Sequence, residues 1–107
     1  MKREDFVAGL NSQLEMSVDE QADILYESLK QDGETLTSII AIEELAELQK
    51  EISKQLRGEG NFYDLLQEMA DVDISLANLM VMHDISSSEL RKVMTVKIDR
   101  EKKRIGR

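Results

Sequence analysis

Two pairs of acidic residues are spaced so that each pair places both carboxylates on one side of a helix. Glu44 and Glu47 form the first pair, and Glu68 and Asp71 form the second, each three residues apart within a segment of helical periodicity. If the two helices pack antiparallel through the short connection 58–60, four carboxylates converge. An all-oxygen site of this kind suits hard cations such as Mg²⁺ or Mn²⁺.

The alternative interpretation of these pairs is an ordinary solvated face, because 34% of the residues are charged. The distribution of basic residues argues against it. No Lys or Arg lies between Arg57 and Arg91, so repulsion between like charges in this segment is not compensated along the helix. A divalent cation would relieve that repulsion, and we therefore prefer a metal site for the four residues together.

Two central helices must position the pairs. The spacing of apolar residues predicts one helix over 35–57, ended by Gly58, and another from Asn61 as its cap to about His83. The first helix carries an apolar seam beside an acidic stripe, and the second carries a polar line down a mostly apolar surface. The acidic stripe consists of Glu44, Glu47, Glu51 and Lys54. The apolar seam consists of Ile42, Leu45, Leu48, Ile52 and Leu56. The polar line consists of Asp64, Glu68, Asp71, Ser75 and Asn78.

The rest of the chain also has helical signals. Residues 3–14 form a weakly amphipathic segment. A capping box at 17–20 begins a helix that runs to about Gln31, and a second capping box at 86–89 begins the final helix. The stripe expected to be buried in the helix to Gln31 consists of Ile24, Leu25 and Leu29.

The expected fold is therefore a single all-α domain over 1–107, a helical bundle of four to five helices. The apolar surfaces of the two central helices exceed what one small bundle can bury. We accordingly expect oligomerisation to complete the bundle, as a homodimer or homotetramer.

Composition and charge exclude several classes of protein. The absence of cysteine excludes disulfides, thiolate metal sites and cysteine nucleophiles. No apolar run suits a signal peptide or a membrane span, so we expect a cytoplasmic protein without membrane contact. Residues 1–90 carry 20 acidic and 6 basic side chains, which argues against a nucleic-acid partner. Residues 91–107 carry 2 acidic and 8 basic side chains. The basic side chains have three possible roles: cations favoured at a helix C-terminus, phosphate ligands, or an arm that binds nucleic acid.

The acidic pairs also carry a resemblance to a known family. Ile-Glu-Glu-Leu-Ala-Glu-Leu at 42–48, followed by Glu-Met-Ala-Asp-Val at 68–72, resembles the EExxE…ExxD signature of the MazG-like, all-α nucleoside triphosphate pyrophosphohydrolases. The resemblance covers about 36–105, so 34–107 would be the catalytic core, and 1–33 match less well.

The resemblance implies roles for particular residues. Glu44, Glu47, Glu68 and Asp71 would bind Mg²⁺, or Mn²⁺ in its place, and Glu43 would support them or orient a water as a base. The catalytic group would thus consist of Glu43, Glu44 and Glu47. The substrate-binding group would consist of Lys54, Asn78, Lys97 and Arg100.

The expected function is Mg²⁺-dependent hydrolysis of a nucleoside or deoxynucleoside triphosphate to the monophosphate and pyrophosphate. This chemistry needs positioning and charge neutralisation more than a covalent nucleophile. The main alternative is a non-enzymatic helical interaction module with an acidic docking face. A weaker alternative is a regulator that binds DNA through residues 91–107.

Overall fold

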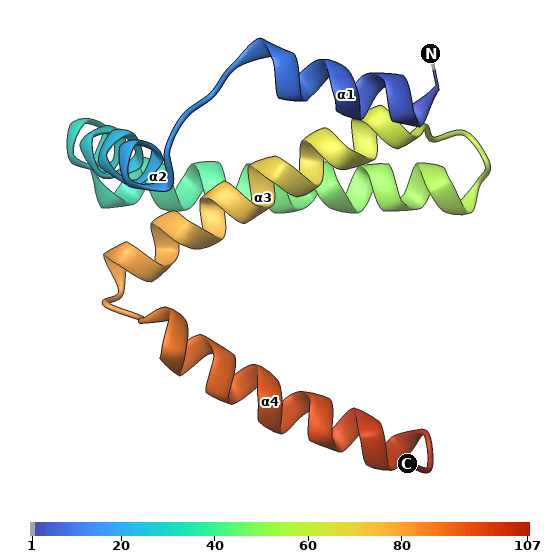
Figure 1. Ribbon diagram of the computed structural model, residues 1–107. Helices are drawn as coiled ribbons and strands as arrows, with labels where there is room; N and C mark the ends of the chain where they lie inside the picture. The colour runs from blue at the N-terminus through green and yellow to red at the C-terminus, as the bar shows by residue number, and fades with distance from the viewer. Residues whose placement is uncertain (1) are drawn as a thin grey trace.

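The computed structural model describes residues 2–107, apart from the side chains of 11–13, and these residues form four α-helices and no strand. The all-α fold predicted from the sequence is confirmed. The bounds of the helices are Arg3–Gln13 for α1, Val18–Leu56 for α2, Phe62–Met82 for α3 and Ser87–Arg104 for α4. The first three helices lie near one another, and α4 extends away from them, so that one side of the molecule is open (Figure 1).

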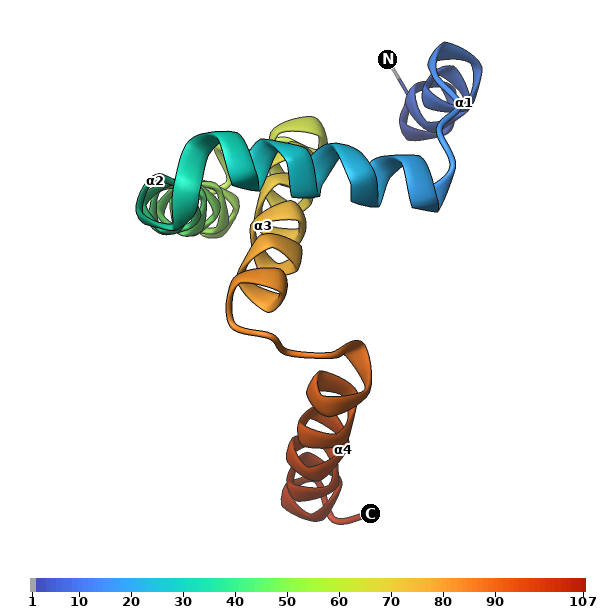
Figure 2. The same ribbon diagram turned by 90° about the vertical axis from the view of Figure 1, so that its left-hand side faces the viewer.

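Helix α2 changes direction sharply at Gly33. This residue has φ 83° and ψ 166°, in the region that favours glycine because it has no Cβ. The two halves of α2 consequently run in different directions (Figures 1 and 2). The break confirms the helix end expected near Gln31, and the Thr37 hydroxyl donates a 2.7 Å hydrogen bond to the Gly33 carbonyl in the first turn beyond it.

The connection from α2 to α3 is tight. Gly58 has φ 73°, and its N–H donates to the Gln55 carbonyl at 3.1 Å. The Glu59 N–H donates to the Lys54 carbonyl at 2.9 Å, so the last carbonyls of α2 are satisfied by the turn. The chain thereby reverses within a few residues, and α3 runs back along the second half of α2 (Figure 1).

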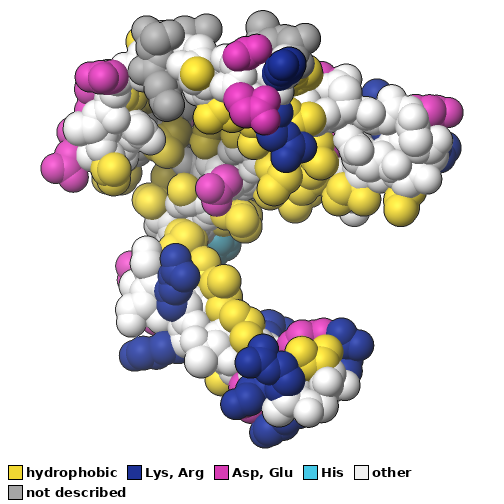
Figure 3. Space-filling model, turned by 45° about the vertical axis from the view of Figure 1, so that its right-hand side comes forward, with side chains coloured by type: hydrophobic (Ala, Val, Ile, Leu, Met, Phe, Trp, Pro, Cys, Tyr) yellow, Lys and Arg dark blue, Asp and Glu magenta, His cyan; other side chains and the backbone are white. Residues whose placement is uncertain are grey.

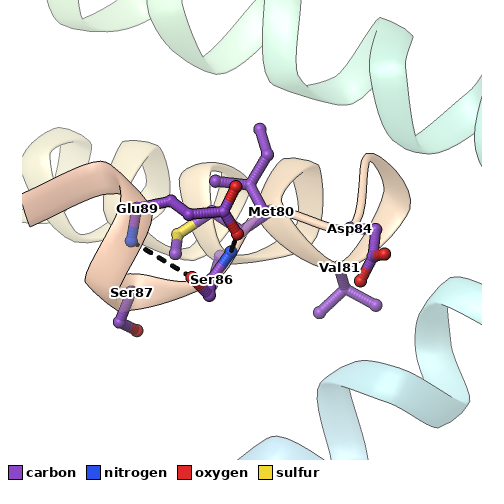
Figure 4. Close-up of a pocket in the computed structure, with 8 residues that line it drawn as sticks. Met80, Val81, Asp84, Ser86, Ser87 and Glu89 are labelled. Atoms are coloured by element: carbon purple, nitrogen blue, oxygen red, sulfur yellow. Dashed lines mark hydrogen bonds between the residues drawn. The ribbon is translucent and has the colours of Figure 1, made fainter. Parts of the chain in front are cut away.

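Side-chain caps begin three of the helices as the sequence predicts. The Asn61 side chain accepts from the Asp64 N–H at 2.9 Å, and Ser17 caps α2 in the same manner. Ser86 and Glu89 form a reciprocal capping box at the start of α4, with bonds of 3.0 and 3.1 Å (Figure 4). These bonds fix where α3 and α4 begin.

Packing is concentrated in one pair of helices. Among the described residues, α2 and α3 make the only extensive helix–helix contact. Helix α1 reaches the start of α3 through the Phe6 ring, whose centroid lies 4.8 Å from that of Tyr63 and 6.3 Å from that of Phe62. Every residue from His83 to Arg107 is exposed, and α4 extends away from the α2–α3 pair (Figure 1). The radius of gyration is 16.9 Å, against about 13 Å for a compact domain of this length.

The buried part of the α2–α3 contact is mostly polar. Ala41, 4% exposed, is the buried hydrophobic residue among those described, whereas the buried polar residues are Thr37, Glu51 and Ser75. The apolar seam of α2 is largely exposed, with half-buried Leu48 as its least exposed member. The prediction of a buried stripe in the first half of α2 is wrong for Ile24, which is exposed because no helix covers that side, although Leu25 and Leu29 are half-buried.

No helix in the described part of the chain is long and apolar enough to span a membrane.

Candidate metal centre

The acidic side of α2 faces the polar line of α3. Glu44 and Glu51, seven residues apart on α2, are half-buried and buried. On α3, Glu68 is half-buried and Ser75 is buried. Because these residues are the ones that lose solvent exposure where the two helices pack, acidic side chains from both helices meet at the contact.

Three carboxylates come together there. Glu44, Glu68 and Asp71 each offer one oxygen, and the three oxygens lie within 4.8 Å of one another. Glu44 and Glu68 are half-buried and Asp71 is exposed, so the group opens to solvent on the Asp71 side. Oxygens around one Mg²⁺ lie at most about 4.2 Å apart, since the ligand distance is about 2.1 Å. The three oxygens are therefore close to the spacing that one Mg²⁺ requires.

The proximity of the carboxylates changes their acidity. Burial raises the pKa of Glu44 above its usual value, and the negative charge of Asp71 and a side-chain hydrogen bond with it raise this pKa further. Burial also raises the pKa of Glu68, followed by the charges of Asp71, Glu47 and Glu51. Since both shifts are caused by desolvation and like charges, the ionised cluster is repulsive, and a bound cation would oppose both effects.

Glu51 is the most buried acidic residue of the cluster, at 6% exposure. Its Oε1 accepts from the Lys54 ammonium at 3.4 Å. Its Oε2 and the Oε2 of Glu68 are buried without a hydrogen-bond partner among the described atoms. Leaving a buried polar group without a hydrogen-bond partner is unfavourable, and more so when the group is charged. These two oxygens therefore fit a hard cation as an additional partner.

Sequence reasoning did not select Glu51 as a site residue. It lies seven residues after Glu44 and four after Glu47, on the same side of α2. This spacing is the signal that could have identified it. Its burial depends on the position of α3, and helical periodicity alone does not give that position.

The other predicted residues on α2 have different surroundings. Glu47 is exposed and lies outside the group of three, but its charge contributes to the raised pKa of both Glu44 and Glu68. Glu43 is exposed. Lys54 is half-buried and pairs with Glu51, so its ammonium is committed to the acidic side of α2.

The remaining predicted substrate ligands do not meet the carboxylates. Asn78 is half-buried and lines a small pocket of about 140 Å³ between α3 and the first half of α2, together with Leu25 and Tyr26. Lys97 and Arg100 are exposed on α4, which extends away from the cluster (Figure 1). A single chain therefore does not bring these two cations to the acidic group.

The donor set determines which ligand the site can take. It contains carboxylate oxygens without nitrogen or sulfur donors, the combination that favours Mg²⁺ and Mn²⁺ over softer metals.

No protein-family model matches the chain, and no curated protein or solved structure matches it. The part of the chain that the structure describes is all-α, with four helices and an acidic triad that is accessible to solvent.

Proposed function

We propose that this protein is a Mg²⁺-dependent hydrolase that cleaves a nucleoside or deoxynucleoside triphosphate to the monophosphate and pyrophosphate. The observation that carries the proposal is the meeting of Glu44, Glu68 and Asp71 within 4.8 Å, from two helices. These three residues occupy positions of the EExxE…ExxD pattern, so the resemblance to MazG-like enzymes and the geometry support the same site.

The buried oxygens favour a metal centre over an acidic docking face. A docking face would direct its carboxylates outward to a basic partner. Here Glu51 is buried, and Glu44 and Glu68 are half-buried between two helices. This arrangement supports a small ligand held between α2 and α3 more than it supports a macromolecular partner.

The roles follow from position. Glu44, Glu68 and Asp71 hold the ion, with Glu47 beside them. When bound, Mg²⁺ neutralises phosphate oxygens and lowers the pKa of a coordinated water. Glu43 is exposed next to Glu44 and serves as the base that accepts a proton from the attacking water. The water oxygen bonds to the α or the β phosphorus, and the bond from that phosphorus to the oxygen bridging the two breaks. The leaving group takes the electron pair and is pyrophosphate in the first case and the monophosphate in the second.

An acidic protein needs cations to accept a triphosphate. Residues 1–90 carry 20 acidic and 6 basic side chains, so the body of the molecule repels phosphate. Lys97 and Arg100 belong to the basic segment 91–107 and would supply positive charge to the substrate. In a single chain they lie on α4, away from the carboxylates, so this role needs α4 of another chain or a movement of α4.

The test is product analysis with purified protein. A panel of ribonucleoside and deoxyribonucleoside triphosphates is incubated with Mg²⁺ or Mn²⁺, and the products are separated by anion-exchange chromatography. We expect monophosphate and pyrophosphate, lost in Asp71→Asn and retained in Asp23→Asn, which makes the same change at an exposed position on the first half of α2. Diphosphate and phosphate as products, or no cleavage by the folded protein with either metal, would overturn the proposal.

A further inference from the structure

Three helices expose apolar side chains along one side each. On α2, Leu45 and Ile52 lie three residues before and four after Leu48, and both are exposed. On α3, Met69 and Leu76 are exposed. On α4, the exposed stripe has spacings of four, four and seven and consists of Leu90, Met94, Ile98 and Ile105. Water contacts all of these surfaces in the single chain.

The amount of exposed surface is too large for a self-sufficient monomer. The chain exposes 8805 Å². A compact monomer of 12.2 kDa exposes about 6,100 Å². The excess of roughly 2,700 Å² per chain, or about 5,400 Å² for two chains, is at the upper end of what obligate interfaces bury, which is about 2,000 to more than 5,000 Å² in total. The excess therefore corresponds to a permanent interface.

The shape of the chain indicates where this interface lies. A hollow separates α4 from the α2–α3 pair, and hydrophobic side chains line both of its sides (Figure 3). On the α2–α3 side, a groove of about 410 Å³ is bordered by Leu48 of α2 and by Leu66, Met69, Val72 and Leu76 of α3. A helix with an apolar stripe fits such a groove.

The charge around the α2–α3 groove indicates which kind of helix would bind in it. Asp73 lies in the groove, and the surrounding residues 1–90 are strongly acidic. The helix that would complement them has an apolar stripe and basic flanks. Helix α4 has both, since residues 91–107 carry 8 basic side chains around Met94 and Ile98. Every copy thus presents one acidic apolar groove and one basic apolar helix.

We propose that a second copy of this chain covers these surfaces, with α4 of each copy seated in the α2–α3 groove of the other. The exchange is reciprocal, so a two-fold axis satisfies both grooves and closes the assembly. It brings the basic helix of one chain against the acidic helices of its partner. This interface is independent of the metal centre, and its test does not involve catalysis.

The first experiment measures molar mass by size-exclusion chromatography with light scattering over a range of protein concentrations. Ile98→Glu and Val96→Glu introduce the same charge at positions that are 62% and 54% exposed in the single chain. Val96 lies off the stripe of Met94 and Ile98. We expect dimers or multiples of dimers for the wild type and Val96→Glu. For Ile98→Glu we expect association between chains to be at least about 10-fold weaker.

A second experiment remains informative if Ile98→Glu does not fold. The chain contains no cysteine, so proteins with single cysteines report contacts between chains. Met69→Cys protein mixed with Met94→Cys protein should form a disulfide-linked heterodimer on mild oxidation, and Met69→Cys with Val96→Cys should not. A monomeric wild type at all concentrations, a dimer broken by Val96→Glu alone, or an intrachain disulfide in the diluted Met69→Cys/Met94→Cys double variant would overturn the proposal.

Discussion

The carboxylates of Glu44 on α2 and Asp71 on α3 place oxygens within 4.8 Å of each other, although α2 ends and the chain reverses between them. Their charges repel, and burial raises the pKa of Glu44 before the charge of Asp71 raises it further. A fold that holds two acidic helix faces together retains this repulsion unless a cation neutralises it.

The first prediction concerns Glu68→Gln and thermal stability. In EDTA the variant should melt at a higher temperature than the wild type, because it removes a charge that repels Asp71 and Glu47. With Mg²⁺ at 100 times its Kd the wild type should gain about 2.7 kcal/mol, which is about 10 °C or more for a chain of this size. The variant should gain little. Differential scanning calorimetry measures both effects, and equal gains in the two proteins would contradict the metal site.

The second prediction concerns pH. The pKa values of Glu44 and Glu68 are raised above the usual 4.5 in the folded protein. As pH rises through 4.5 the unfolded state loses these protons first, so the free energy of unfolding falls until the folded pKa values are passed, and then levels. Urea unfolding in EDTA from mildly acidic to neutral pH should show this loss. The double variant Glu44→Gln/Glu68→Gln should have a flatter profile, and parallel profiles would refute the coupling.

The third prediction concerns Glu51, whose Oε2 is buried without a partner. Glu51→Gln should weaken Mg²⁺ binding by about 10–100-fold, the range found when groups that support metal ligands are changed. Isothermal titration calorimetry measures the affinity. Glu27→Gln, an exposed site on the first half of α2, is the matched control and should bind as the wild type does. Unchanged binding in Glu51→Gln would make this residue structural only.

The fourth prediction concerns the break in α2. Gly33→Ala should destabilise the protein by about 1–3 kcal/mol, the cost of holding a residue with a Cβ in a backbone region that is essentially restricted to glycine, because Gly33 has φ 83° and ψ 166°. No atom lies within 4 Å of the added Cβ, so the effect is conformational and not steric. Gly9→Ala, inside α1, where an added Cβ would also meet nothing within 4 Å, should be neutral or stabilising. Urea unfolding compares the two, and equal effects would show that φ at Gly33 does not matter.

Much of the fold could be predicted from local signals. The caps at Asn61 and Ser86 and the turn at Gly58 act over a few residues, so the sequence contains what defines them. The convergence of Glu44 with Glu68 and Asp71 was also predictable, because a short reversal and a spacing of three residues determine it.

The side of α2 that α3 covers was not predictable from periodicity. An apolar seam and an acidic stripe lie side by side on α2, and one partner helix covers only one of them. In the structure α3 covers the acidic side around Glu51, and Ile52 remains exposed. The direction of α4 could not be predicted from local signals either, because no other part of the chain packs against its apolar stripe around Ile98.

The most direct test of the central claim is a Mn²⁺ titration followed by electron paramagnetic resonance, in which free Mn²⁺ gives the strong signal and bound Mn²⁺ a weak one. The wild type should remove Mn²⁺ from solution, and excess Mg²⁺ should release it. Asp71→Asn should bind at least about 100-fold more weakly, beyond the range for groups outside the ligand set, and Asp73→Asn should bind normally. A folded wild type that leaves the free Mn²⁺ signal unchanged, or equal binding by Asp71→Asn and Asp73→Asn, would contradict a metal centre between α2 and α3.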